Sequence, residues 1–164
     1  MSVRSLLAAA ALALIPSIAP AQITPATSGD VDPAEFVRIL QSMGNTAKVQ
    51  TDKDGEPEIE GRTQNINFLI FFYNCQKQAQ PVRCRSYQFW ASFHDLNPRP
   101  TLEQLNQWNE TKRLAQASTD GQGRYRLKMN VNPKGADVDV SFRAYMEWWN
   151  LALREYMVYI GFRK

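Results

Sequence analysis

The sequence predicts an α+β domain: an antiparallel sheet of about five strands packed with helices, in the order α-β-β-β-α-β-β-α. Three observations predict this fold. Strand-like segments occur at intervals between residues 47 and 131, polar turns separate most of them, and helix start signals stand at Asp32, Thr101 and Asp137. Hairpins interrupted by helices are typical of an α+β sandwich.

The first helix is expected to begin at Asp32. The Asp32 side chain can cap the helix, Pro33 suits the first helical position, and Glu35 has the spacing of a capping box. Apolar residues then repeat at helical spacing as far as Met43, and Gly44 supplies the stop.

Strand-like segments follow this helix. Ala47–Thr51 and Glu58–Arg62 are short and flank a turn at Gly55. Ile66–Tyr73 is the most β-prone stretch of the chain and is apolar on both faces from Phe68 onward. We therefore expect a central strand there, covered at least partly on both sides.

The two cysteines, Cys75 and Cys84, lie at the facing ends of the strand segments Asn65–Asn74 and Arg85–Phe93. A disulfide is the expected state of such a pair in an exported chain. A free or metal-binding pair is the alternative, although the chain has no C-x-x-C motif. The second segment alternates with period two, and only Trp90 breaks the pattern.

A second helix is expected from residue 102 to about Arg113, with Thr101 and Gln104 forming a capping box. Two Asn residues flank a Trp inside it, and because Asn is a poor helix former they indicate specific hydrogen bonds. Those bonds either tie the helix to neighbouring loops or contact a ligand or partner. The candidate residues are Asn106, Trp108, Asn109 and Arg113.

Leu114–Thr119 fits either the last turn of this helix or another strand. Asp120–Gly123 has the composition of a hairpin turn, and Tyr125–Val131 alternates as a strand does.

The last helix, capped by Asp137, carries a wide stripe of apolar and aromatic residues. Core packing is the default explanation, and a dimer or client-binding surface is the alternative, because aromatic side chains dominate interface hot spots. The candidate interface residues are Tyr145, Trp148, Trp149, Tyr156 and Tyr159.

Residues 1–21 have the pattern of a cleaved secretory signal. Arg4 precedes the apolar run Leu6–Ile15, and Ala19-Pro20-Ala21 supplies a small-x-small cleavage site. The run is shorter than the roughly 20 apolar residues of a membrane span. We expect a periplasmic or secreted protein without membrane insertion after cleavage. Its predicted parts are a signal peptide at 1–21, a flexible lead at 22–30 and a single domain at 31–164.

The charges and motifs exclude several classes of function. With 19 Lys and Arg against 16 Asp and Glu, interleaved along the chain, the net charge of +3 does not favour nucleic acid. His94 is the only histidine, so a two-histidine metal site cannot be built. The acids between Asp52 and Glu60 fit a solvated hairpin better than a calcium loop. We expect no catalytic residues, metal or cofactor; a hydrolase using His94 or an acid pair is the weakest alternative.

Several of these segments resemble the exported branch of the YbjN-domain family, described as bacterial sensory transduction regulators. The resemblance rests on FLIFFYNC, CRSYQFWASF and LNQWNETKRLAQ followed by a strand, a D-G turn and a strand. It runs from about Val31 to Gly161, and the LNxWN segment with Arg113 is its most specific part. The fold of this family is similar to that of class I type III secretion chaperones, which commonly form dimers. The resemblance implies protein binding, and it brings no catalytic residues.

Two hypotheses for the function follow. In the leading one, an exported, non-enzymatic protein binds another protein, or a second copy of itself, through its sheet or long helix. In the alternative, a small ligand occupies an apolar cavity between helix and sheet. The residues expected to line that cavity are Phe68, Phe72, Trp90 and Trp108.

Overall fold

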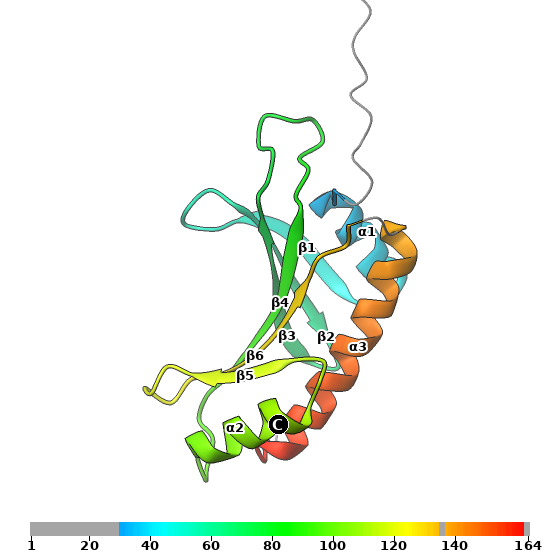
Figure 1. Ribbon diagram of the computed structural model, residues 1–164. Coiled ribbons are helices and arrows are strands. Elements are labelled where there is room, and N and C mark those ends of the chain that lie inside the picture. Colours follow the sequence, from blue (N-terminus) through cyan, green and yellow to red (C-terminus); the bar gives the residue numbers. More distant parts are fainter. Residues whose placement is uncertain (1–29, 135–136, 163–164) are drawn as a thin grey trace, which may run out of the picture.

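The computed structural model describes residues 30–134 and 137–162, which form three helices and one six-stranded antiparallel sheet (Figure 1). The predicted α+β class is confirmed. The sheet has six strands where about five were expected, and four of them precede α2 where the predicted order had three. Both short segments around Gly55 form the expected strands and pair along their whole length. The elements are α1 (Pro33–Ser42), β1 (Thr46–Thr51), β2 (Pro57–Thr63), β3 (Ile66–Tyr73), β4 (Ser86–Phe93), α2 (Leu102–Thr111), β5 (Gln116–Thr119), β6 (Tyr125–Val131) and α3 (Val138–Tyr159).

Each helix begins at the predicted cap. The Asp32 carboxylate accepts a hydrogen bond from the amide of Ala34 at 2.8 Å, and the capping box predicted for α2 is present. The Asp137 carboxylate accepts one from the amide of Val140 at 3.0 Å. Helix α2 ends at Thr111, two residues before the expected end at about Arg113. Of the segment Leu114–Thr119, which fitted either a helical turn or a strand, the last four residues form β5.

The strands pair in the order β1-β2-β3-β4-β6-β5. Because successive residues of a strand point to opposite sides, each strand contributes alternate side chains to two faces. Figure 1 shows the helices on one of these faces: α3 runs along the sheet, with α1 near its beginning and α2 near its end.

The helix-covered face holds the core. Every second side chain of β3 and β4 is buried there, and the ring of Phe89 stacks on that of Trp149 with centroids 5.3 Å apart. Burying such rings is the main source of stability for a domain of this size. The buried residues of α3 are Phe142, Met146, Trp149, Ala152, Leu153 and Tyr156.

Gly61 of β2 is directly opposite Phe68 of β3. A Cβ atom at position 61 would lie 2.5 Å from the Phe68 ring, closer than packed carbon atoms come. The missing side chain therefore makes room for the ring, and this part of the core depends on a glycine in the strand.

Three buried polar atoms of the core have no hydrogen-bond partner among the described residues: Tyr87 Oη, Trp149 Nε1 and Tyr156 Oη. Burial raises the pKa of both tyrosine hydroxyls, so both remain neutral. Each unpaired group reduces stability, because it has left water without gaining a partner.

The second face of the sheet carries no described helix, which corrects the expectation that the central strand is covered on both sides. Leu69 and Phe71 of β3 point to this face and are half-buried only by their neighbours on the sheet. The apolar pattern on both faces of β3 therefore reflects an aromatic cluster on an open sheet face, not a second layer.

The expected disulfide joins Cys75 to Cys84 at the β3–β4 connection. Cys84 also exchanges two backbone hydrogen bonds with Val31, at 2.8 and 2.9 Å, so the chain enters α1 beside the disulfide. The predicted signal peptide at 1–21 and nearly all of the flexible lead at 22–30 lie outside the described residues. No helix within the described ranges is long and apolar enough to cross a membrane.

Candidate functional site

The motif of α2 fixes that helix to the edge of the sheet. Trp108 Nε1 donates a hydrogen bond to the carbonyl of Ala115 at 2.9 Å. The carboxamide of Asn109 donates to the carbonyl of Ala117 at 3.0 Å and accepts from its amide at 2.7 Å. Trp108 and Asn109 therefore tie the helix to the neighbouring chain segment, which is the first of the two roles considered for this motif. The other motif residues, both exposed, are Asn106 and Arg113.

The candidate interface residues of α3 fall into two groups. Trp149 and Tyr156 are fully buried against the sheet, so these two belong to the core and are not a surface for a partner. Their spacing places them on the inner stripe of the helix. Trp148 is 43% exposed. Tyr145 is half-buried in contact with the Trp148 ring, and Tyr159 is half-buried about three turns further along α3.

The four residues expected to line an apolar pocket do not share a cavity. Phe68 and Phe72 are packed in the core on the covered face, and Trp108 is buried under α2. Trp90 lies on the opposite, open face of the sheet. Three of the four side chains expected to line the cavity between helix and sheet, Phe68, Phe72 and Trp108, are therefore packed in the core instead.

His94 follows the last residue of β4, and its side chain is 71% exposed. Its Nδ1 lies 2.6 Å from the carboxylate of Asp95, the next residue in the chain. Among the described residues, no three His, Cys, Asp or Glu side chains are placed to hold a metal ion.

The open face of the sheet carries an aromatic cluster at its centre. Strand register places Trp90 of β4 between Leu69 of β3 and Lys128 of β6. The Phe71 ring meets Trp90 edge-on, with centroids 5.7 Å apart. These apolar side chains shield one another and are only partly buried, and such a cluster on a bare sheet is a candidate binding surface.

Two cations lie over the Trp90 indole. Lys128 Nζ is 4.5 Å from the ring centroid, and the guanidinium carbon of Arg126 is 5.3 Å from it. The negative face of the ring attracts both groups. Within the described part of the chain, Lys128 has no ion-pair partner. We call the surface formed by Leu69, Phe71, Trp90, Arg126 and Lys128 the Trp90 face.

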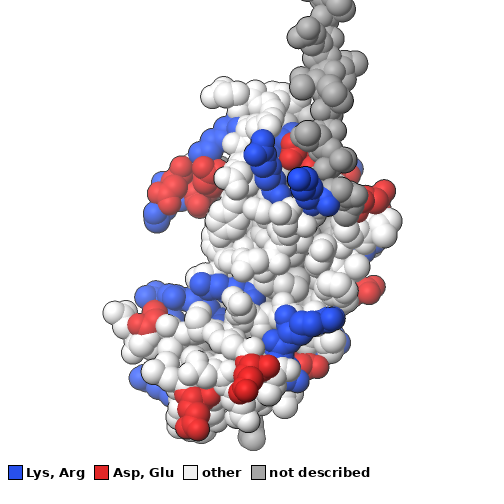
Figure 2. Space-filling view, viewed as in Figure 1, with Lys and Arg blue, Asp and Glu red and all other residues white. Residues whose placement is uncertain are grey.

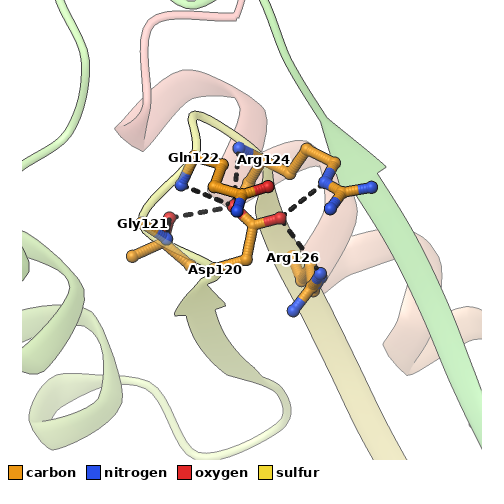
Figure 3. Close-up of polar contacts among 6 residues, drawn as sticks. Asp120, Gly121, Gln122, Arg124 and Arg126 are labelled. Carbon is orange, nitrogen blue, oxygen red and sulfur yellow. Dashed lines mark hydrogen bonds and ion pairs between the residues drawn. The ribbon is translucent and has the colours of Figure 1, made fainter.

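Asp120, in the β5–β6 turn, holds the basic side of this surface in place (Figure 3). Its carboxylate accepts hydrogen bonds from the amides of Gln122 and Arg124, at 2.9 and 3.2 Å. It also pairs with the guanidinium groups of Arg124 and Arg126. The amide of Gln122, followed by Arg124, lowers the pKa of Asp120 to about 2. The carboxylate is therefore charged at neutral pH and fixes the position of Arg126.

The other side of the aromatic cluster carries two carboxylates, one of which is paired with a lysine. Glu58 of β2 pairs in register with Phe71, is almost buried, and accepts a hydrogen bond from Gln50 at 2.6 Å. Glu60, on the same face, forms an ion pair with Lys48 at 2.8 Å. Figure 2 shows acidic side chains on the β1–β2 hairpin and basic ones along the β5–β6 hairpin. Between them the surface is uncharged and the outline recedes.

A row of polar side chains borders the cluster. The Tyr73 hydroxyl donates to the carboxamide oxygen of Gln88 at 3.5 Å, and the Gln88 amide group donates to Asn130. The row crosses three strands and orients side chains that can themselves hydrogen-bond to a partner.

Comparison with known families gives one match. Residues 32–157 match the YbjN family, described as "Putative bacterial sensory transduction regulator". The chain belongs to the YbjN family. The YbjN match contains both the α2 motif and the Trp90 face, so both are parts of the family domain. Neither a curated protein nor a solved structure matches the chain.

Sequence reasoning did not find the Trp90 face of this YbjN domain. Two signals were present: Trp90 breaks the alternation of its strand, and Phe71 is apolar on the second face. The position of Lys128 beside Trp90 depends on β6 pairing with β4, while β5 lies outside β6. That strand order follows from long-range packing and has no local sequence signal.

Proposed function

We propose that this protein is an exported, non-enzymatic regulator that binds a partner protein on the Trp90 face. The observation that carries the proposal is an aromatic cluster at the centre of a sheet face that no described helix covers. Exposed aromatic side chains surrounded by polar groups are typical of interaction hot spots.

The charges around the cluster support a protein as the occupant. Lys128 and Arg126 lie on one side of Trp90, and Glu58 and Glu60 lie on the other. A partner with an apolar centre and charges of opposite sign at its two ends would bind in one orientation only. As part of this proposal, the domain has a fold similar to that of type III secretion chaperones, which bind protein clients, and it uses that fold to bind a protein.

Export is the second part of the proposal, and the signal-like segment at 1–21 and the Cys75–Cys84 disulfide support it. The full chain should be expressed in a Gram-negative host, fractionated, and measured by intact-protein mass spectrometry. We expect the periplasmic protein to begin at Gln22 and to carry the oxidised cysteine pair. A full-length, reduced protein confined to the cytoplasm would refute export.

The binding site is tested by site-specific photo-crosslinking in the source bacterium. Tyr73 is 43% exposed on the open face, so a benzoylphenylalanine there should form a crosslink with the bound partner. Leu102 on α2, 69% exposed, is the matched control position. We expect a protein adduct from position 73 and none from position 102.

The adduct must also depend on the aromatic cluster. In a Trp90→Ala/Lys128→Glu background we expect it to disappear, while circular dichroism and melting show a folded protein. An adduct of equal yield in this background, or one that forms only at position 102, would refute binding at the Trp90 face.

A further inference from the structure

The outer side of α3 carries a second apolar stripe, which no described element covers. Leu151 lies opposite the buried stripe of the helix and is 39% exposed. Trp148 and Val158 are 43% and 83% exposed, and Ala144 continues the line two turns before Leu151. In Figure 1, α3 forms the outermost layer on its side of the molecule.

Two opposite charges accompany this stripe along one flank. Glu147 and Arg154 are seven residues apart, so they lie on the same side of α3, one before and one after Leu151. Both are exposed, and neither forms an ion pair with any residue in the described ranges. They are too far apart along the helix to pair with each other.

A depression adjoins the C-terminal part of the stripe and extends to its other flank. It has a volume of about 450 Å³ and lies between the C-terminal half of α3 and the end of α2. Its lining combines aromatic rings with two cations and one carboxylate. Lys112 pairs with Glu155 at 2.9 Å, and Arg154 also lines the depression. The lining residues are Trp108, Lys112, Arg154, Glu155, Val158 and Tyr159.

We propose that a second copy of this chain docks on the outer side of α3, with the two helices antiparallel and the two Leu151 side chains meeting at the two-fold axis. A two-fold axis brings each residue before Leu151 opposite one that follows it by the same distance. Ala144 then lies opposite Val158 of the second copy, a small residue against a protruding one.

This register also pairs the charges. Along the helix, Glu147 lies about 6 Å before Leu151 and Arg154 about 4.5 Å after it. Because the two-fold axis keeps the flanks together, Glu147 of each copy lies beside Arg154 of the other. Two ion pairs therefore form on one flank of the interface, and the charges select the antiparallel arrangement.

Trp148 lies on the flank of the stripe to which the depression extends. In the same register its indole enters the depression of the second copy, close to Lys112 and Glu155. Burial of an aromatic anchor in a pocket is the usual centre of binding energy in an interface, and the Lys112 ammonium adds a cation–π contact. The Trp90 face lies on the opposite side of the sheet, so dimerisation leaves it free and this inference does not depend on the proposed function.

The test is the mass and dissociation constant of the purified protein in solution, by light scattering and sedimentation equilibrium. We expect a dimer in the wild type. Leu151→Glu places two carboxylates at the two-fold axis and should weaken the dimer at least a hundredfold, and Trp148→Ala should weaken it at least tenfold. Leu102→Glu, an exposed apolar residue outside the stripe, is the matched control and should have no effect.

The register is tested by exchanging charges. Glu147→Arg and Arg154→Glu should each weaken the dimer about tenfold, because each creates two like-charge contacts. The double variant Glu147→Arg/Arg154→Glu should restore it to within about threefold of the wild type. A wild-type monomer at millimolar concentration, a dimer unaffected by Leu151→Glu, or a double variant no better than the single ones would overturn the proposal. All variants are exposed substitutions, and melting curves verify that each is folded.

Discussion

The side-chain carboxamide of Asn109 binds both backbone groups of Ala117, donating to the carbonyl at 3.0 Å and accepting from the amide at 2.7 Å. Asn109 therefore supplies the donor and the acceptor that a neighbouring strand would supply to the edge strand β5. One side chain on α2 therefore closes this edge of the sheet at Ala117, and the edge cannot pair there with another chain.

Replacing Asn109 with Ala should lower the free energy of unfolding by about 1 to 2 kcal/mol, because two backbone groups lose their partner. Asn106→Ala, at the exposed position of the same motif, should change stability by less than about 0.5 kcal/mol. Urea denaturation followed by tryptophan fluorescence measures both. Equal effects of the two substitutions would contradict the edge-closing role of Asn109.

Removing the Tyr156 hydroxyl should leave stability unchanged or raise it by up to about 1 kcal/mol, because the buried oxygen has no partner among the described residues. Tyr125→Phe is the matched control, since its hydroxyl donates to the carbonyl of Pro100 at 3.1 Å. That substitution should cost about 1 kcal/mol. Thermal melts of the two Tyr→Phe variants give the comparison, and a larger loss for Tyr156→Phe would contradict it.

Opening the disulfide should destabilise the protein by about 2.5 to 3 kcal/mol, the chain-entropy value for a loop closed by residues nine apart. The Cys75→Ser/Cys84→Ser variant and the reduced wild type should give the same loss in urea denaturation. Because Cys84 also pairs with Val31, amide hydrogen exchange at Val31 should become faster in both. Unchanged exchange there would show that the backbone bridge stands without the disulfide.

Asp120 should make stability depend on acid. Its pKa is about 2 in the folded protein, mainly because the Gln122 amide donates to the carboxylate, against an ordinary value near 3.8. The unfolded chain therefore takes up the proton first, and stability falls as the pH drops from about 4 to about 2. NMR titration of the carboxyl carbon should report the low pKa, and Asp120→Asn should remove this part of the pH dependence. A midpoint near 4 would contradict the turn geometry.

The sequence predicted the fold well where signals are local. The caps at Asp32, Thr101 and Asp137 are the observed helix starts, and the alternation of β4 and β6 gave their buried faces. Both segments around Gly55 were expected as strands, but the predicted element order counted only three strands before the second helix where the structure has four. The pattern of β1 is weak because it is an edge strand whose residues are exposed or only partly buried.

The candidate surfaces were harder to predict. The five aromatic residues of the last helix lie on a broad stripe, and only tertiary packing separates buried Trp149 from exposed Trp148. Trp90 was noted as an exception to its strand pattern, but the cations over its ring come from β6, some 36 residues later in the chain. Pairing between distant strands is a tertiary property that no short window of sequence contains.

The close approach of Phe68 to Gly61 also limits how this domain can change over evolutionary time. Any side chain at position 61 collides with the Phe68 ring, so a larger residue is accepted at 61 only after Phe68 has been replaced by a smaller residue. A chain that loses the ring first passes through a sequence with a cavity, and one that gains the side chain first passes through a clash. Substitutions at positions 61 and 68 are therefore expected to occur in the same lineages, with the smaller residue at 68 appearing before the larger residue at 61.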